Sequence, residues 1–263
     1  MLAEMLLYRL TRTEDWIDRI GYRAGAVRLW SRYGRLKKIW APHLDRTRRF
    51  VCDAARASQG RKTALVFGSG LLADLPLAEL CDQFARVELV DIVHLPNARW
   101  RTRRFANVRH RVCDLTGVGA GLVAGDLPVP HCTDGLGVAG IDFVVSLNLV
   151  SQLPLAAVDW LETKRGWAAE RCEAYGAQIV AAHLAHLRAF DCPVCLVGDA
   201  ARSALAKAGG PTERQDALFG VALPPADAAW DWELAPLGEI SKEYAVRNHV
   251  VAIRELHDST RIA

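Results

Sequence analysis

Short strand-like runs alternate with longer segments of helical periodicity from residue 63 onward. Such runs, bounded by polar turn signals, are typical of strands in the interior of a sheet. Their alternation with helices predicts an α/β protein whose sheet is mainly parallel and carries helices on both faces. The five strands expected in this part of the chain are Thr63–Phe67, Val87–Val90, Val108–Cys113, Ile141–Leu147 and Val194–Val197.

Apolar residues at helical spacing, among them Trp16 and Trp30, predict an amphipathic helix over 13–36. Pro42 predicts a break after it, because proline lacks the N–H that a helix interior needs. Asp74 is a suitable N-cap for the helix that follows the first strand. The other expected helices cover about 44–58, 74–84, 155–190 with a break near Arg165-Gly166, and the stretch from Asp199 to Lys207.

Two segments depart from the alternation of strands and helices. Gly117–Gly140 holds seven of the 20 glycines, which predicts a long loop with little structure of its own. The tail contains two strand candidates in succession, Trp230–Leu234 and Ala245–Ile253, joined by a polar connection that holds Gly238. The tail therefore predicts a pair of strands without a helix between them.

Polar clusters follow four of the expected strands. The carboxyl ends of parallel strands meet at one edge of a sheet, so these clusters predict one ligand site. Glycines let the backbone turn tightly and approach a ligand, and an acid after the second strand can accept hydrogen bonds from a ribose diol. The clusters are Gly68-Ser69-Gly70, Asp91, Asp114, and Ser146 with Asn148.

Together these clusters resemble the class I S-adenosylmethionine-dependent methyltransferases over roughly residues 60–256. The resemblance implies a Rossmann-like methyltransferase fold: three α/β/α layers, with a mostly parallel seven-stranded sheet. It also implies S-adenosylmethionine as cofactor and transfer of a methyl group to a small molecule. Residues 1–60 would then form a basic helical N-terminal extension, and 61–263 the methyltransferase-like α/β domain.

The resemblance assigns cofactor-binding roles to six residues and leaves the catalytic residues unassigned. The glycine loop would cradle the amino-acid end of the cofactor, the acid after the second strand would bind the ribose, and the acid after the third would face the adenine amino group. The segment after the fourth strand would line the methyl-transfer site. The six residues are Gly68, Ser69, Gly70, Asp91, Asp114 and Asn148.

Two residues of the glycine loop depart from the family pattern. Val66 stands where the family usually has an acid that helps to hold the ammonium group of the cofactor. Leu72 stands where a third glycine is usual, and adds bulk beside the ligand. Both departures bear on cofactor affinity, and therefore on whether the protein is an active enzyme.

Two other functions fit the same loop. Gly68, Gly70 and Ala73 also match the dinucleotide fingerprint, with Asp91 at a suitable distance, so the chain could be an NAD(P)-dependent oxidoreductase. Against this, no Tyr-x-x-x-Lys pair of the short-chain dehydrogenase type is present, and Pro76 lies where the phosphate-binding helix should run on. The third alternative is a methyltransferase-like fold kept as a non-catalytic binding module.

Charge is distributed unevenly along the chain. Residues 1–62 carry 15 Lys/Arg against 6 Asp/Glu, whereas the remainder carries 18 against 24. This basic segment could contact nucleic acid or another anionic partner, although the solvated faces of docked helices are the more common explanation.

Composition predicts an ordinary globular protein, with 51% apolar residues and 24% charged residues. No signal peptide and no apolar run long enough to span a membrane are found, and the seven scattered cysteines suggest reduced thiols. We therefore expect a cytoplasmic protein without membrane contact. The sequence leaves its oligomeric state open.

Several other polar residues have weaker claims to function. His94 could reach the cofactor, but a loop histidine with a backbone partner is the more common case. Trp100 lies among four arginines in what we expect to be a solvated connector. Cys192 and Cys195, like His183 and His186, lack the additional ligands of a metal site, so no metal is predicted.

Overall fold

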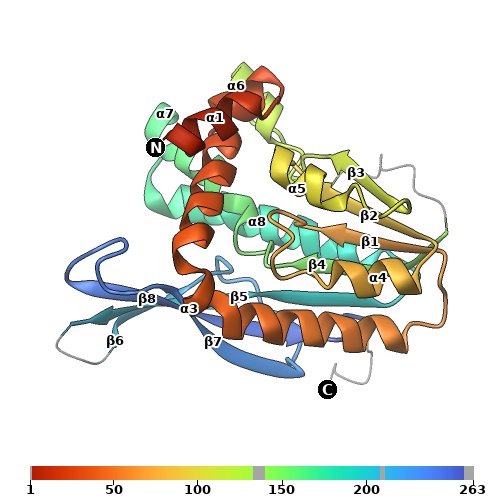
Figure 1. The fold of residues 1–263 in the computed structure, drawn as a ribbon. Helices are drawn as coiled ribbons and strands as arrows, with labels where there is room; N and C mark the ends of the chain where they lie inside the picture. The colour runs from red at the N-terminus through yellow and green to blue at the C-terminus, as the bar shows by residue number, and fades with distance from the viewer. Residues whose placement is uncertain (1, 133–139, 208–210, 258–263) are drawn as a thin grey trace.

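A mixed eight-stranded sheet lies at the centre of the protein in the computed structural model, which describes residues 2–132, 140–207 and 211–257 (Figure 1). Seven strands form the path β3-β2-β1-β4-β5-β8-β7, and β6 pairs with β5 beside it. The strands are β1 Thr63–Phe67, β2 Arg86–Asp91, β3 Val108–Val112, β4 Ile141–Leu147, β5 Val194–Ala206, β6 Pro211–Asp216, β7 Ala228–Ala235 and β8 Tyr244–Ile253.

The strand directions confirm the expected fold class. Strands β1 to β5 pair in parallel with their neighbours along the path. β8 is antiparallel to both β5 and β7, so β7 runs in the same direction as β5. This is the doubly wound order with one reversed strand in the tail. Seven strands form the continuous path, as predicted, and β6 adds an eighth beside it, antiparallel to β5.

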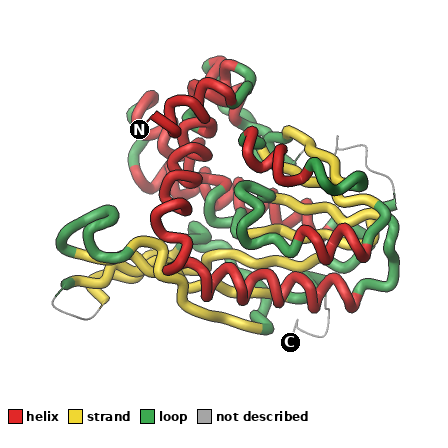
Figure 2. The backbone as a smooth tube through the Cα atoms, viewed as in Figure 1, coloured by secondary structure: helices red, strands yellow, loops and turns green. Residues whose placement is uncertain are grey.

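Helices cover both faces of the sheet, as Figure 2 shows, so the three-layer prediction is confirmed. One core cluster joins the sheet to α3 and α4, and a second joins it to α7 and α8. The helices are α1 Leu2–Leu10, α2 Asp15–Arg19, α3 Tyr22–Ala57, α4 Leu77–Gln83, α5 Pro96–Thr102, α6 Gly119–Ala124, α7 Leu153–Arg165 and α8 Ala169–Arg188.

Successive side chains of β1 point to opposite faces of the sheet, so this fully apolar strand contributes to the core on both faces. All five of its residues are buried. Ala64 and Val66 belong to the core beneath α3, whereas Leu65 and Phe67 belong to the core over α7 and α8. Val66 therefore packs inside the protein.

Helix α3 replaces the two helices that we expected on either side of Pro42. It continues through the proline for 36 residues, and Figure 1 shows that it changes direction along its length. Because Pro42 donates no hydrogen bond and crowds the preceding turn, it accounts for the bend without ending the helix. The helix begins after Gly21, whose φ of 98° only glycine adopts without strain, so the expected start near residue 13 was also wrong.

Other helix predictions were wrong where tertiary contacts decide the structure. The stretch from Asp199 to Lys207, expected to be a helix, continues β5 and pairs with β8. α4 begins only at Leu77, and Asp74 does not cap it. The loop expected over 117–140 contains the short helix α6, and residues 133–139 of it lie outside the described part.

The remaining expectations agree with the structure. β1 and β4 have the predicted bounds, and the tail forms the antiparallel pair β7 and β8. The break between α7 and α8 falls at Gly166, which has a left-handed φ of 63°. The residues of β5 beyond 199, together with β6 and the start of β8, project beyond the rest of the sheet (Figure 1); we call them the arm.

Trp40 fastens α3 to the sheet close to the bend. Its indole N–H donates to the backbone oxygen of Leu234 in β7 at 3.0 Å, and its ring meets Trp232 edge-on with centroids 5.1 Å apart. The side chain is almost fully buried. This contact sets how the first half of α3 stands over the sheet.

Trp40→Ala should lower the free energy of unfolding by about 3–5 kcal/mol, because it leaves a large cavity and an unpaired buried carbonyl. Urea unfolding followed by circular dichroism measures the change. Ile39→Ala, on the exposed side of the same turn, is the matched control and should cost much less. A loss below about 1 kcal/mol for Trp40→Ala would show that α3 does not depend on this contact.

Candidate active site

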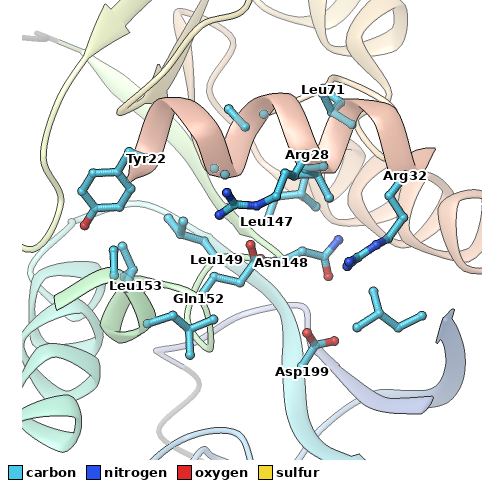
Figure 3. A pocket seen from close by; sticks show the side chains of 18 of the residues that line it. Tyr22, Arg28, Arg32, Leu71, Leu147, Asn148, Leu149, Gln152, Leu153 and Asp199 are labelled. Carbon is cyan, nitrogen blue, oxygen red and sulfur yellow. The ribbon is translucent and has the colours of Figure 1, made fainter. Parts of the chain in front are cut away.

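A cleft of about 1150 Å³ lies along the carboxyl ends of the parallel strands. The first half of α3 covers it from above, and the arm closes one end (Figures 1 and 3). Clefts at this edge are where open α/β sheets bind ligands. The volume exceeds the range of about 300–1,000 Å³ that is typical of small-molecule pockets, so two small ligands can share it.

The glycine loop and Asp91 build one end of the cleft, which we call the glycine-loop half. Gly70 N–H donates to Asp91 Oδ2 at 2.7 Å, and Val93 N–H donates to Oδ1 at 3.3 Å. A Cβ on Gly68 would lie 2.6 Å from the backbone oxygen of Leu147, so only glycine fits there. A Cβ on Gly70 would be in ordinary contact with Asp91 Oδ2, 3.9 Å away, so the glycine leaves room for a ligand atom beside the carboxylate.

Burial raises the pKa of Asp91 above its ordinary value, and the N–H groups of Gly70, Val93 and Ile92 partly offset this effect. An ionised carboxylate offers about four acceptor sites. Asp91 therefore retains capacity for a ligand hydroxyl.

Asp114 lies in the same half and is held by the turn that follows β3. Its Oδ1 accepts from the backbone and the hydroxyl of Thr116, at 2.9 and 2.6 Å, and its Oδ2 accepts from Gly119 N–H at 2.9 Å. Tyr22 of α3 hydrogen-bonds Thr116 from above. Burial and the charges of Asp114 and Asp91 raise the pKa of Tyr22, so the phenol stays neutral.

Asn148 follows β4 in a left-handed conformation, with φ of 47°. Its Nδ2 donates to Asp74 Oδ2 at 2.7 Å, while its buried Oδ1 has no hydrogen-bond partner in the described part of the chain. Asp74 also lines the cleft, and burial raises its pKa. Sequence reasoning treated Asp74 as a helix cap. Its contact with Asn148 could not be foreseen, because the two residues lie 74 positions apart in the chain.

Five of the six predicted cofactor residues line the cleft: Gly68, Gly70, Asp91, Asp114 and Asn148. The sixth, Ser69, is 1% exposed and does not line it. Leu72 adopts the positive φ, 58°, that a glycine would tolerate, and its side chain is buried in the core. The bulk that we expected to obstruct the ligand therefore points into the core.

His43 lies where α3 crosses the cleft, and sequence reasoning missed it. Trp230 Nε1 donates to its Nδ1 at 3.1 Å, and its ring stacks on Trp232 with centroids 4.1 Å apart. Burial lowers the pKa of His43 to about 3, so the ring is neutral. Because Nδ1 accepts, Nε2 carries the proton; Asn148 Nδ2, 3.4 Å away, is itself a donor, so it is not an acceptor for this proton. His43 can donate here but is not a base.

Asp199 belongs to the opposite end of the cleft, which we call the arm half. It is 2% exposed, and β5 bulges next to it, between Asp199 and Ala201. Its Oδ2 accepts from Asn248 at 2.8 Å and from Ser151 at 3.4 Å, and its Oδ1 has no hydrogen-bond partner among the described residues. Burial raises the pKa of Asp199 from 3.8 to about 6. Its position just beyond the expected strand Val194–Val197 is the signal that could have found it.

Arginines accompany Asp199 in the arm half. Arg202 Nε donates to Asn248 Oδ1 at 3.2 Å, and so supports the amide that binds Asp199. Arg28 and Arg32 project from α3 into the cleft; in Figure 3 Arg32 extends toward Asn148 and Asp199, and Arg28 lies above Leu147 and Leu149. The sequence suggested only the solvated face of a helix for these two arginines.

The weaker candidates do not join the cleft. His94 Nε2 contacts the backbone oxygen of Arg111 at 2.8 Å, which confirms the expected backbone partner. Trp100 is 69% exposed. His183 is buried and bonds Ser146 at 2.9 Å, and Cys195 is buried in β5. No group of three metal-ligating side chains occurs among the described residues.

Several arginines of the basic N-terminal segment are engaged in ion pairs. Arg23 pairs with Asp18, Arg35 with Glu239 at 2.6 Å, and Arg56 with Asp53 at 3.0 Å. Within the described part of the chain, no helix is both long and apolar enough to cross a membrane.

Comparison with known proteins gives distant structural likenesses only. No protein-family model matches the chain, and no curated protein matches its sequence. A DhpI–SAH complex is 15% identical over 83% of this chain and 91% of that one, with a TM-score of 0.36. A Burkholderia thailandensis 1,6-didemethyltoxoflavin-N1-methyltransferase with bound S-adenosylhomocysteine is 16% identical over 88% of each chain, with a TM-score of 0.38.

A third likeness is to SAM-bound CalS10, an amino pentose methyltransferase from Micromonospora echinaspora. It is 17% identical over 78% of this chain and 90% of that one, with a TM-score of 0.33. The fold assignment rests on the strand order of the sheet, and these distant likenesses add no argument about the site.

The raised pKa of Asp199 predicts a stability that falls with pH. Below about pH 4 the folded and unfolded chains both hold the proton, and as the pH rises toward 6 only the folded chain holds it. Relative to Asp199→Asn, the native protein should lose roughly 2–3 kcal/mol of unfolding free energy between these limits. Urea unfolding at pH 4.5 and 7.5 measures the change, with the exposed Asp53→Asn as control. A difference independent of pH would contradict the raised pKa.

Proposed function

We propose that the protein is an S-adenosylmethionine-dependent methyltransferase that acts on a small molecule. The observation that carries this proposal is that residues from the ends of four parallel strands line one cleft that is polar at both ends. The glycine-loop half suits a nucleoside with an amino-acid tail, and the arm half leaves room for an acceptor.

The residues of the glycine-loop half fit the cofactor. Asp91 would bind the ribose hydroxyls beside the space left by Gly70, and Asp114 would face the adenine amino group. The ammonium group would lie against Asp74, which brings a carboxylate to the loop where Val66 brings none. Asn148 Oδ1, buried without a partner in the described part of the chain, would accept from the same end of the cofactor.

S-adenosylmethionine, when bound, supplies a methyl group on a positively charged sulfur. The acceptor atom would form its bond to the methyl carbon as the carbon–sulfur bond broke, and the electron pair of that bond would stay on sulfur. The proton of the acceptor then passes to a base. Asp199 suits this role, because its free Oδ1 is buried and its pKa of about 6 is close to neutral pH. His43 does not, because its Nε2 already carries the ring proton.

The start of α4 favours this function over that of a dinucleotide-dependent oxidoreductase. In a dinucleotide fold, the helix that follows the glycine loop directs its N-terminus at the pyrophosphate. Here α4 starts only at Leu77, seven residues after Gly70, and has seven residues itself. The loop therefore offers a carboxylate-lined cradle without a helix terminus for phosphate.

Calorimetry with S-adenosylhomocysteine tests the cofactor assignment. The wild-type protein should bind it, and Asp91→Ala should weaken binding about tenfold to a hundredfold, since charged hydrogen bonds are lost. Asp82→Ala, on the exposed side of α4, is the matched control and should bind like wild type.

Two results would contradict the proposal. Absence of binding up to millimolar S-adenosylhomocysteine would indicate a non-catalytic module, and binding of NADPH alone would indicate an oxidoreductase. Unchanged affinity of Asp91→Ala would show that the ribose lies elsewhere.

Asp74→Asn distinguishes binding of the amino-acid end of the cofactor from binding of its nucleoside end. It should weaken S-adenosylhomocysteine about tenfold, because the ammonium group loses its carboxylate. It should leave 5′-methylthioadenosine unaffected, because this nucleoside lacks the amino-acid end. Asp91→Ala should weaken both ligands. Equal losses for both ligands with Asp74→Asn would contradict the role of Asp74 as a substitute for the missing acid at Val66.

A further inference from the structure

We propose that the acceptor is a small organic anion, with an apolar, ring-bearing body, whose acidic group binds Arg28 and Arg32. This inference rests on the proposed function, since it names the class of molecule that the arm half would hold. It comes from the charge that α3 places over the cleft.

Arg28 and Arg32 lie four residues apart on α3, so they project from the same side of the helix. Both line the cleft, and Figure 3 shows their side chains extending into it. Arginine presents a fork of donors that matches a carboxylate or a phosphate. Two such forks one turn apart can bind one acidic group from two directions.

Neither arginine is committed to a strong partner within the described residues. Arg28 has no ion pair or hydrogen bond there. Arg32 Nε is buried without a hydrogen bond, and its nearest carboxylate, that of Glu239, is 3.7 Å away. Glu239 is itself bound by Arg35 at 2.6 Å. A buried donor without a partner costs free energy, so Arg32 marks a place where a ligand acceptor belongs.

Besides Asp199, the carboxylates of Asp74, Asp91, Asp114 and Asp159 line the cleft, and Asp74 is bound by Asn148. Asp91 and Asp114 accept backbone N–H groups in the glycine-loop half. Arg202 is bound to Asn248, which binds Asp199. An acidic group at Arg28 and Arg32 would leave Asp199 free to face the nucleophile of the same molecule.

The walls of the arm half are apolar and partly aromatic. Trp40 and Trp232 are almost fully buried, with Trp232 stacked on His43, whereas Tyr244 keeps 38% of its surface exposed. Side chains of this kind favour a planar or ring-bearing body over a flexible polar one. The wall residues are Trp40, Trp232, Leu234, Ile240, Tyr244 and Val246.

Matched pairs of aromatic carboxylic acids and their primary amides test this inference. Each pair has the same shape and differs in charge. Ligand-observed NMR, with and without S-adenosylhomocysteine, should show acids binding about tenfold more tightly than their amides, as expected for charge-assisted bonds. The double variant Arg28→Gln/Arg32→Gln should lose this preference, because glutamine keeps the polar character without the charge. Arg49→Gln, on the exposed side of the same helix, is the matched control and should retain it.

The outcomes separate this inference from the proposed function. If S-adenosylhomocysteine binds but the acids show no preference over their amides, or the double variant keeps the preference, the anionic acceptor is wrong and the cofactor assignment stands. If the acids are preferred through Arg28 and Arg32 but S-adenosylhomocysteine does not bind, the anion site stands and the methyltransferase proposal fails. If Arg49→Gln also lost the preference for acids, the overall charge of the protein would explain that preference, and the inference would be overturned.

Discussion

The contact between α3 and β7 is the constraint on which the rest of the structure depends. Trp40 and His43 lie on either side of Pro42, and both hold the tryptophans of β7, by hydrogen bonding and by ring contact. Beyond this point α3 packs into the core of the sheet, and before it the helix stands over the cleft. Because the bend is held on both sides, the second half of α3 packs on the sheet while the first half covers the cleft. The height of the cleft therefore follows from core packing.

The two ends of the cleft differ in how their charges are satisfied. In the glycine-loop half, carboxylates are held by backbone N–H groups, whose positions the strands and turns determine. In the arm half, arginines of a helix face a carboxylate that is buried and incompletely bonded.

Sequence reasoning succeeded where local pattern decides the structure. β1 and β4 are apolar runs with polar boundaries, and both have the predicted bounds. It failed where distant partners decide: residues 199–206 have helical character but pair with β8, and tertiary pairing overrides weak propensity. The residues after the strands could be found because topology brings strand ends together. Arg28 and Arg32 could not, because nothing in an amphipathic pattern indicates that a cleft lies beneath the polar face.

The bulge beside Asp199 divides β5 into two parts that pair with different sets of strands. The residues before it belong to the parallel sheet and are tied to the core on both faces, whereas those after it pair only within the arm. A change in the length or composition of the arm is therefore absorbed without disturbing the strands that carry the glycine loop. A single irregular residue pair in one strand therefore marks the border between the part of the cleft built on the parallel sheet and the part built on the arm.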